Sequence, residues 1–527
     1  YYNAVSTLGM SSGKFYCEIS PVRGYSYFGI ATGDVVTNTW GGDQTNNTAW
    51  VLHTNGSIYH NNATTNGTGF PTPGTSGDYT LGLLFDADNK TMRYVDKGVV
   101  SKVYNMANTV DGDLFYFFVG GDAGSYEIDV NFGQKPFKFS PPDGFQPLNV
   151  ANLRPETVIA RPDQFVGIVT YTGNVTARSI TMDNSLMSPD FVWIKTRNHA
   201  YWHYLYDTVR GATKELYSNA TNAEATDAGG LTSFDSNGFS LGTNIATNGS
   251  AKTLVAWCWR AGGAPTATNN NTSGAMDANS VSIDGVLQSA YTPSGSPSVY
   301  PKKMSIGTKQ GFSIVTWSRS SSTDSIPHGL SQAPTFIIQK STSAAKRWQV
   351  GLSVLGWDRR MYLELTNADE DSTSFGYTGN FGPTNTLLRT GGTSYVDGDM
   401  VAFCWHDVPG LQKFGSFEGN GNANGPFVEL GFRPSIVLLK TADDAANWML
   451  YDNKRGTFNP NNFVLSPNTD DGGSTYDGYS SAYPIDFLSN GFKVRTNVTN
   501  SNSNTVTYAA WAEAPTVNLF GGGANAR

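Results

Sequence analysis

The sequence predicts an all-β, multidomain chain: a string of antiparallel β-sandwiches. Short apolar and aromatic runs recur along all 527 residues, and clusters of Gly, Asn, Ser and Thr separate them. Gly occurs 58 times and aromatic residues make up 13% of the chain, a composition typical of short strands joined by tight turns. Long stretches rich in Ala, Leu, Glu and Lys are absent, so we expect no long helices.

Composition and charge exclude several functional classes. Hydrophobic residues make up 39% of the chain, enough for packed cores and against wholesale disorder. The net charge is −8 and no cluster of Lys and Arg stands out, so we expect no nucleic-acid partner, which would require a positive stripe. No apolar run approaches the ~20 residues that cross a bilayer, so membrane insertion is not expected either.

The cysteines and the chain start bear on where the protein is made. Cys17, Cys258 and Cys404 lie far apart, each in an apolar run, which predicts buried free thiols rather than a disulfide framework. That pattern suits a protein assembled in a reducing cytoplasm. The chain shows neither an initiator Met nor a signal peptide at its start, so we expect it to begin inside a longer or processed polypeptide.

Residues 1–150 are predicted to form one two-sheet sandwich. Strands are expected at 25–31, at 79–86 and 91–95 around the turn 88–90, at 114–121 and at 126–132. This region resembles the SPRY domain in its opening Gly-Lys-Phe-Tyr (13–16), its Tyr-Phe-Gly-Ile-Ala strand (27–31), its hairpin (82–92) and its closing Val-Asn-Phe-Gly-Gln-Lys-Pro-Phe (130–137). The resemblance implies a bent sandwich that binds partners through its loops and is not an enzyme.

An internal repeat organises the rest of the chain. The strand at 189–195 recurs at 334–340 and at 434–440, and each copy is followed by a Trp: Trp202, Trp348 and Trp448. Each copy closes on another apolar strand, at 255–259, 401–405 and 508–511. Three β-rich repeats are therefore predicted, at 160–263, 311–409 and 411–515.

Further matches link the first and third repeats. Both carry a Tyr-Asp pair followed by Arg-Gly, at 206–211 and 451–456, and a Ser-Asn-Gly-Phe segment, at 236–239 and 489–492. Between the first two repeats, residues 264–310 are rich in Asn, Thr, Ser, Gly and Pro and are predicted to be a polar linker with one hairpin around 281–285. Residues 516–527 are predicted to be a flexible tail.

The repeat resembles an uncharacterised module of predicted structural proteins of marine phages. In those proteins the module often follows a SPRY-like or lectin-like domain, and the junction at 143–149 fits that order. The resemblance implies a role in a virus particle and names no ligand.

Aromatic residues supply the candidate binding site. The long loop from Thr37 to Gly77 has an aromatic, Asn- and Gly-rich composition that resembles an adaptable binding surface, and its candidate residues are Trp40, Trp50, His53, Tyr59, His60 and Phe70. Trp202, Trp348 and Trp448 follow polar stretches and are candidates for stacking a sugar or a partner, although core packing is the favoured alternative for them. Trp257, Trp259, Trp405 and Trp511 are expected in the core.

Catalytic and metal sites are not expected, and no cofactor is predicted. Glu127, Asp129 and Asn131 share one strand face, as in sandwich glycosidases, but Asn131 cannot act as the acid/base. The acidic stretches 86–89 and 111–113 are better explained as turns than as calcium sites. His199 and His203 are four residues apart, a spacing that aligns zinc ligands only on a helix.

These observations predict a non-enzymatic phage virion protein. The first hypothesis is a tail fibre or other host-facing adhesin that binds a host-surface glycan or protein, with a homotrimeric fibre supplying multivalency. Its partners would be other virion proteins, and it would be assembled in the host cytoplasm and exposed outside the cell. A head-fibre, decoration or tail-assembly spacer without a ligand is the second hypothesis, and a polysaccharide depolymerase is the third.

Overall fold

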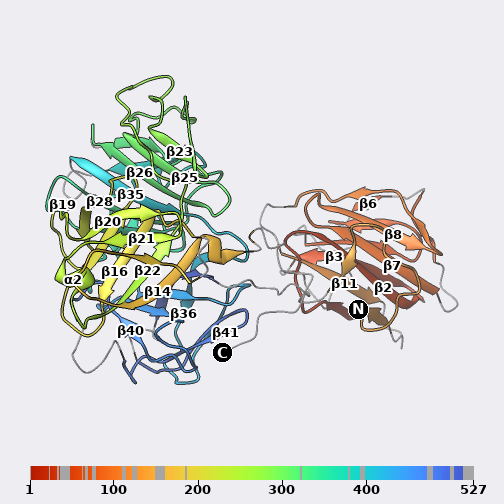
Figure 1. Ribbon diagram of the computed structural model, residues 1–527. Helices are drawn as coiled ribbons and strands as arrows, with labels where there is room; N and C mark the ends of the chain where they lie inside the picture. The colour runs from red at the N-terminus through yellow and green to blue at the C-terminus, as the bar shows by residue number, and fades with distance from the viewer. Residues whose placement is uncertain are drawn as a thin grey trace. The chain divides into compact units, whose positions relative to one another are not determined.

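The computed structural model divides into two compact units, residues 1–156 and 157–527 (Figure 1). It describes the chain except residues 1, 23, 33–34, 36–47, 62, 66–68, 74–78, 110–113, 122–127, 149–158, 160, 184–186, 321–322, 378–379, 392–397, 472–478, 499–501, 503 and 514–527. Apart from Asn502, the helical residues that the structure describes form three short segments: α2 (Ile245–Asn248), η2 (Pro162–Gln164) and η3 (Ser353–Leu355). The prediction of an all-β chain of antiparallel sandwiches is confirmed.

The first unit is a sandwich of two sheets. One sheet has the order β1 (Tyr2–Val5), β11 (Phe115–Gly121), β3 (Ser26–Thr32), β4 (Ala49–His53), β5 (Ile58–His60) and β6 (Ala63–Thr65). The other has the order β10 (Tyr104–Asn105), β8 (Thr91–Asp96), β7 (Tyr79–Asp86), β2 (Lys14–Val22) and β12 (Asp129–Asn131), with β9 (Val99–Val100) on β8 and β13 (Gln146–Pro147) on β2.

Strand alternation builds the core of this unit. Phe15, Cys17 and Ile19 of β2 project between the two sheets, because successive side chains of a strand point to opposite faces. Tyr16 therefore lies on the outer face, where its ring packs edge-on against Phe137 at 4.9 Å.

The second unit contains three β-sandwiches, which we call modules 1, 2 and 3. The larger sheet of module 1 has the order β14 (Val166–Thr172), β22 (Thr253–Trp259), β16 (Phe191–Thr196), β17 (His203–Asp207), β18 (Lys214–Tyr217) and β19 (Ala225–Thr226). Its smaller sheet has the order β15 (Arg178–Thr181), β21 (Gly238–Leu241) and β20 (Leu231–Asp235).

Modules 2 and 3 repeat this plan. The larger sheet of module 2 is β24 (Val286–Leu287), β23 (Val281–Ile283), β25 (Lys303–Gly307), β26 (Phe312–Ser318), β35 (Asp399–Trp405), β28 (Phe336–Ser341) and β29 (Gln349–Leu352). Beside it lie three strand pairs: β27 (Thr323–Pro327) with β34 (Leu387–Gly391), β30 (Arg359–Arg360) with β31 (Glu370–Asp371), and β32 (Gly376–Tyr377) with β33 (Asn380–Phe381). The larger sheet of module 3 has the order β36 (Gln412–Glu418), β43 (Thr505–Trp511), β38 (Ile436–Thr441), β39 (Met449–Asp452) and β40 (Val464–Leu465). Its smaller sheet has the order β37 (Phe427–Glu429), β42 (Gly491–Val494) and β41 (Ile485–Leu488).

The shared Ser-Asn-Gly-Phe segments form the turns of equivalent hairpins. Gly238 follows the turn between β20 and β21, and Gly491 follows the turn between β41 and β42. A Cβ at either glycine would lie 2.0 Å from a backbone oxygen of the neighbouring strand, that of Ile180 or of Val428. Glycine is therefore required at both positions by the close approach of the next strand.

Residues 264–310 differ from the predicted polar linker. They hold the hairpin β23–β24, and β25 continues the larger sheet of module 2 by pairing with β26. Met276, Val281, Met304 and Ile306 of this segment are buried in the core of module 2. The linker prediction was wrong because the polar composition belongs to the turns, while the few apolar residues are spaced to enter a core. The predicted tail, 516–527, lies outside the described residues.

The central strands of the modules are buried on both faces. In β22, Leu254, Ala256 and Cys258 face the core between the two sheets of module 1. Val255, Trp257 and Trp259 face the opposite way, into a second core. Burial on both sides explains why these strands are continuous apolar runs rather than alternating ones.

The second core is shared by all three modules. Its residues come from module 1, module 2 and module 3 alike, so the larger sheets pack their outer faces on one another. The sheet registers match: β16 pairs Phe191 with Trp259, β28 pairs Phe336 with Trp405, and β38 pairs Ile436 with Trp511. The three modules therefore surround one central core in a pseudo-threefold arrangement.

Candidate binding surface beside a closed three-module core

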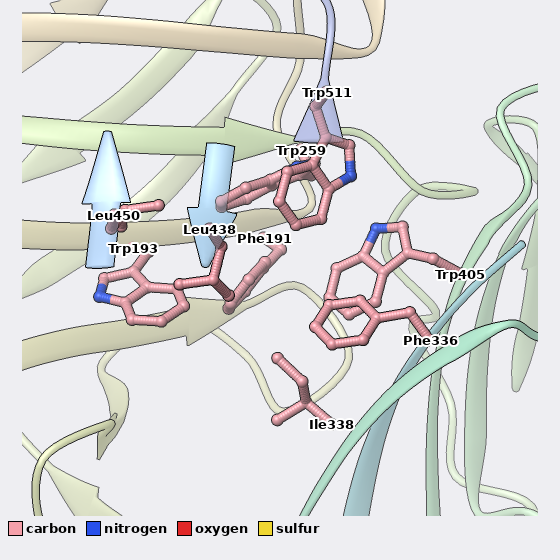
Figure 2. A pocket seen from close by; sticks show the side chains of 9 residues that line it. All are labelled: Phe191, Trp193, Trp259, Phe336, Ile338, Trp405, Leu438, Leu450 and Trp511. Carbon is pink, nitrogen blue, oxygen red and sulfur yellow. The ribbon is translucent and has the colours of Figure 1, made fainter. Parts of the chain in front are cut away.

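The central core is closed. Figure 2 shows a small cavity where the modules meet, of about 10 Å³, lined by three side chains from each: Phe191, Trp193, Trp259, Phe336, Ile338, Trp405, Leu438, Leu450 and Trp511. A space of this size is at the lower limit for one water molecule, and it offers only aromatic and aliphatic walls. The centre of the ring is therefore packing, with no room for a ligand.

Three equivalent tryptophans meet edge to face in this core. The rings of Trp259 and Trp511 lie 5.4 Å apart and those of Trp405 and Trp511 lie 6.0 Å apart, each pair at 68°. All three indole nitrogens are buried, and no hydrogen-bond acceptor among the described residues reaches them. Edge-to-face packing presents the positive ring edge to a negative ring face, which compensates such N–H groups in part.

Side-chain hydrogen bonds run from each module to the next. The Trp348 indole of module 2 donates to the backbone oxygen of Tyr217 in module 1, at 2.8 Å. The Trp448 indole of module 3 donates to the equivalent oxygen of Tyr362 in module 2, also at 2.8 Å. In module 1 the equivalent side chain is His203, whose Nε2 has no hydrogen-bond partner among the described residues. The contact with module 3 is made instead by the Ser218 hydroxyl, which donates to the Pro467 carbonyl at 2.7 Å. The interactions thus follow the ring around and close it between the last module and the first.

Strand register corrects one match made from the sequence. Trp193 pairs with Leu205, as Ile338 pairs with Val350 and Leu438 with Leu450. The residue two positions before each partner is His203, Trp348 and Trp448, so Trp202 is not the equivalent of the other two tryptophans. The equivalents of Trp202 are Arg347 and Asn447.

His203 is held as a neutral ring in the core. Its Nδ1 accepts a hydrogen bond from the Trp193 indole at 2.9 Å, and its ring lies parallel to Trp257 at 6.4 Å. Burial lowers the pKa of His203 well below its usual value, the charge of Lys195 lowers it further, and the Ser466 backbone opposes both. With Nδ1 engaged by an indole, this ring packs rather than binds metal.

Each module also buries one lysine at the same position. Lys195, Lys340 and Lys440 are fully buried, and each ammonium donates to the carbonyl of the next residue, at 2.9, 2.7 and 2.7 Å. Lys195 donates in addition to the Asp470 backbone oxygen of module 3, at 3.1 Å. Burial lowers the pKa of all three lysines to about 8. Nearby carboxylates act in the opposite direction and raise the pKa of each lysine, but by less than burial lowers it. Sequence reasoning missed these residues, although each ends the repeated strand motif.

Buried ion pairs occupy two of the three module boundaries. Arg455 donates to Asp452 at 2.5 Å with both side chains buried, and the Trp257 indole of module 1 donates to the same carboxylate at 3.0 Å. Asp207 and Arg210 form the matching pair in module 1. These are the repeated Tyr-Asp and Arg-Gly segments of the sequence, and their role is structural.

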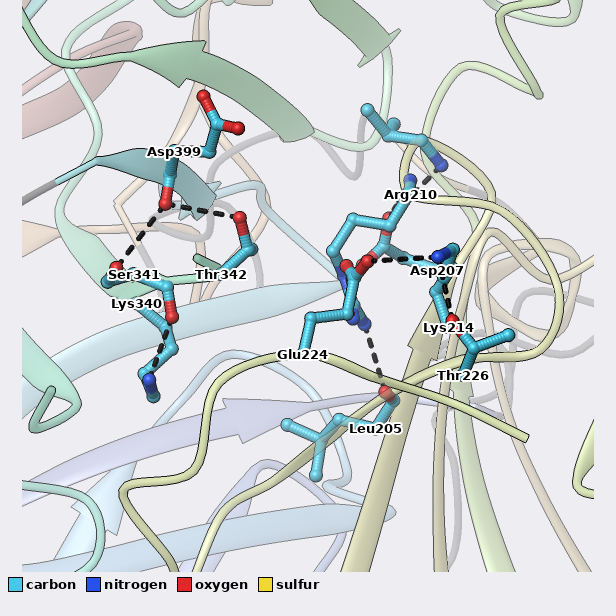
Figure 3. A network of polar contacts seen from close by, with 11 residues as sticks. Leu205, Asp207, Arg210, Lys214, Glu224, Thr226, Lys340, Ser341, Thr342 and Asp399 are labelled. Carbon is cyan, nitrogen blue, oxygen red and sulfur yellow. Dashed lines mark hydrogen bonds and ion pairs between the residues drawn. The ribbon is translucent and has the colours of Figure 1, made fainter. Parts of the chain in front are cut away.

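Figure 3 shows the surroundings of Arg210 at the boundary between modules 1 and 2. Besides Asp207, the guanidinium donates to the Leu205 carbonyl at 2.9 Å and to Glu224 at 3.3 Å. The backbone nitrogen of Glu224 then donates to the Thr342 oxygen of module 2 at 2.8 Å. The ion pair therefore supports a segment that hydrogen-bonds directly to the next module.

The loop candidates of the first unit are mostly interior. Trp50 is fully buried on β4, its indole donates to the Ala107 oxygen at 3.1 Å, and its ring stacks on His60 at 4.7 Å. Phe70 is also buried and packs edge-on against Tyr94. These rings hold the loop to the sandwich and are not available to a ligand at the surface. Trp40 lies outside the described residues.

Tyr59 is half-buried, whereas His53 is buried. The two rings pack edge-on at 5.9 Å, and the exposed Tyr25 ring lies 6.0 Å from His53. Burial lowers the pKa of His53, and the Asn55 hydrogen bond opposes that shift. This small aromatic group is the part of the predicted loop site that the structure brings together.

Among the repeat tryptophans, only Trp202 is a surface residue. Trp348 and Trp448 are buried in the central core, in agreement with the packing alternative. Trp202 keeps 38% of its surface exposed and packs on Tyr217 with ring centres 4.6 Å apart. Tyr204 lies next to Tyr217, at 5.3 Å and perpendicular to it. These three rings form the aromatic strip of module 1.

The acidic candidates are occupied by turn contacts. The Asp86 carboxylate accepts from the Asn89 backbone and side chain, at 3.0 and 2.9 Å, and pairs with Lys14 at 3.1 Å. Asn131 accepts from the backbone of the following turn, and Asp129 is exposed, whereas Glu127 and 111–113 lie outside the described residues. Within the described part of the chain, no group of three metal-binding side chains occurs. The helices described there are too short to cross a membrane.

One protein-family model matches the second unit of the chain. A family model described as a domain of unknown function (DUF7483) matches residues 161–299 and 296–515, which together span most of the chain. No curated protein sequence matches the chain.

Solved structures similar to this chain include three with low overall scores. The SPRY domain of human HERC1 is 15% identical, with 25% of this chain and 84% of that chain covered and a TM-score of 0.22. The TRIM65 PSpry domain is 13% identical, with 25% of this chain and 69% of that chain covered and a TM-score of 0.19. Stonustoxin is 21% identical, with 22% of this chain and 19% of that chain covered and a TM-score of 0.18.

Proposed function

The chain belongs to the DUF7483 family, a domain of unknown function, and on that premise we propose that it is a non-enzymatic structural protein of a phage particle. Its role would be that of a tail fibre or other host-facing appendage that binds a host-surface glycan or protein. The observation that carries this proposal is the closed, pseudo-threefold body formed by its repeated modules. Such a body is a rigid mount for surface residues and has no cleft at its centre.

The division between interior and surface supports a display role. Equivalent interior positions keep large side chains, as at Trp259, Trp405 and Trp511. Equivalent surface positions differ in chemistry, as at Trp202, Arg347 and Asn447. A scaffold that repeats its packing and varies its outer residues is what a binding protein with several distinct faces requires.

The closed body also bears on the proposed homotrimer. Three modules of one chain already complete the central core, so copies of the chain are not needed to bury it. A trimeric fibre would have to use other surfaces of the chain, and its benefit would be multivalent binding rather than folding.

The test is to locate the chain on purified particles. Mass spectrometry should find it as a particle component, and antibody labelling in electron micrographs should place it at the distal end of an appendage. Purified chain should compete with particles for adsorption to host cells. Label on the head or inside the tail, without competition, would favour the spacer hypothesis. Absence of the chain from particles would overturn the proposal, and release of reducing sugar ends from host polysaccharide would replace it with the depolymerase.

A further inference from the structure

The aromatic strip of module 1 is a preformed surface. Tyr204 and Tyr217 are direct partners across β17 and β18, and Trp202 lies just before β17 against the Tyr217 ring. Trp202 is exposed, Tyr204 is half-buried and Tyr217 is buried. The strip therefore offers the Trp202 indole and part of the Tyr204 ring to solvent, and the buried Tyr217 ring packs against both.

A buried carboxylate fixes the strip from below. Glu215 accepts from the Tyr217 hydroxyl at 2.5 Å and from the Tyr206 hydroxyl at 2.8 Å. Its two oxygens are thus engaged by two rings of the same sheet. Rings held in this way lose little conformational entropy when a ligand binds, which favours binding to a small surface.

The fold does not require an aromatic residue at the Trp202 position. In module 2 the equivalent Arg347 lies over the Tyr362 ring at 5.2 Å. In module 3 the equivalent Asn447 accepts a hydrogen bond from the Asn468 side chain at 2.7 Å. The same backbone site thus accepts an indole, a guanidinium or an amide, so packing on the neighbouring tyrosine does not by itself require the exposed indole of module 1.

The surroundings of Trp202 favour a sugar over a protein surface. In the described part of module 1, no other large hydrophobic side chain is exposed between Val175 and Ile245. A protein interface would need a wider apolar patch around its central aromatic residue. The neighbouring side chain Asn219 is instead polar, and its amide oxygen accepts from the His203 backbone nitrogen, next to Trp202, at 3.1 Å.

Charge points to a neutral sugar. Buried charges of both signs lie beside the strip: Glu215 accepts from the Tyr217 hydroxyl at 2.5 Å, and the Lys195 ammonium donates to the Tyr201 carbonyl, next to Trp202, at 2.8 Å. No single sign of charge prevails there, so the strip does not select an ionic sugar. A pyranose ring has one face of C–H groups that packs on an aromatic ring, and hydroxyls at its rim that hydrogen-bond to amides and tyrosine hydroxyls. The strip and its amide neighbours offer both kinds of contact.

We infer that the aromatic strip of module 1, formed by Trp202, Tyr204 and Tyr217, is a binding site for a neutral pyranose of a surface polysaccharide. The inference deepens the proposed function by naming the ligand class and the site, and it rests on that function for its biological setting. The sugar stacks on Trp202 and hydrogen-bonds to the polar groups beside the strip.

The test uses the whole purified chain and neutral oligosaccharides of glucose, galactose and mannose as probes. Saturation-transfer NMR detects weak contacts, and titration gives the dissociation constant. Trp202→Asn places the module 3 residue at this position, and Phe458→Ala, which removes an 80% exposed ring of module 3, is the matched control. We expect at least one probe to bind, Trp202→Asn to weaken it 10-fold or more, and Phe458→Ala to leave it unchanged.

Two results would overturn the inference. One is the absence of binding for every neutral probe, including the case in which only acidic sugars or a protein bind. The other is equal binding of the sugar by the wild type and by Trp202→Asn, where Trp202→Asn and Phe458→Ala both unfold at the same temperature as the wild type. The two tests are independent. If no sugar binds, the proposal that the chain is part of a phage particle is unaffected. If the chain is missing from particles, a sugar site that depends on Trp202 would still be demonstrated.

Discussion

Module 1 and modules 2 and 3 solve the same packing problem with different chemistry. The buried position from which the Trp348 and Trp448 indoles donate to the neighbouring module holds His203 in module 1. The smaller, polar imidazole is accompanied by Trp193, which fills space and hydrogen-bonds to it. The comparison teaches that the backbone arrangement is kept while pairs of neighbouring side chains change together.

A second difference separates module 2 from the other two. Where modules 1 and 3 bury an aspartate and an arginine, module 2 has Leu352 at the strand position of the aspartate and, three residues later in η3, the partly buried Leu355. Asp452 faces a polar partner, the Trp257 indole of module 1. A module boundary of this fold thus accepts either an ion pair or two leucines, as expected when burial of charges offsets most of their attraction.

Removing a tryptophan of the core that the three modules share should cause the largest loss of stability. Trp511→Ala should lower the free energy of unfolding by about 3–5 kcal/mol, because it leaves a cavity where three modules meet. Trp202→Ala should cost well under that amount, because the side chain is partly exposed. Denaturant unfolding of the whole chain measures both, and equal losses would contradict a shared core.

The ion-pair comparison is sharpened by giving module 3 the leucines of module 2. Arg455→Leu leaves Asp452 charged and buried, and we expect a loss of about 3–5 kcal/mol. The double change Asp452→Leu and Arg455→Leu should cost less, about 1–3 kcal/mol, mainly for the unpaired Trp257 indole. A double variant less stable than the single one in the same unfolding assay would show that the ion pair itself holds modules 3 and 1 together.

The His203 comparison predicts a pH effect. The folded state keeps His203 neutral, so below about pH 6.5 the unfolded chain binds a proton that the folded chain does not. Stability should therefore fall as the pH falls below 6.5, by up to about 1.4 kcal/mol per pH unit from this group. The double variant Trp193→Leu and His203→Trp, which copies module 3, should lose this component when its pH–stability profile is compared with that of the wild type. Superimposable profiles would show that His203 is not neutral in the folded chain.

The buried lysines give the smallest expected effect. Each has a folded pKa of about 8 against an ordinary value of 10.5, so between these values the unfolded chain binds more protons. Stability should thus rise from pH 8 to pH 9, and Lys440→Met should reduce that rise by about 1 kcal/mol. Thermal unfolding at both pH values measures it, and an unchanged rise would mean that the carbonyl cage keeps Lys440 fully protonated.

The repeat and the all-β class were predictable because strand motifs are local. The closure of the ring was not, since it depends on contacts between residues hundreds of positions apart, such as Lys195 and Asp470. One local sign existed: in β22 apolar residues stand at consecutive positions, which requires a second core behind the first. The sequence also shows that Trp202 is not the equivalent of the other two tryptophans. Trp348 and Trp448 each lie eight residues after the lysine of their repeat, whereas Trp202 lies seven residues after Lys195.

The candidate site was predicted less well than the fold. Composition placed it in the loop after Thr37, but β4 runs through that loop and buries Trp50, because a run of large apolar residues packs wherever a sheet has room. Exposure of a single ring is decided by its neighbours in space. Trp202 is left at the surface because His203, the next residue, takes the interior position.

The most direct test of the account is whether the last module closes on the first in a single chain. Lys454 of module 3 lies 2.5 Å from the Asp183 carboxylate of module 1 and 3.9 Å from Glu513 of its own module. A carbodiimide joins such pairs with no spacer, and peptide mass spectrometry of the monomer identifies the linked residues. The account predicts the Lys454–Asp183 link in monomeric protein. Recovery of the Lys454–Glu513 link alone, or of Lys454–Asp183 only between chains, would contradict a closed ring of three modules.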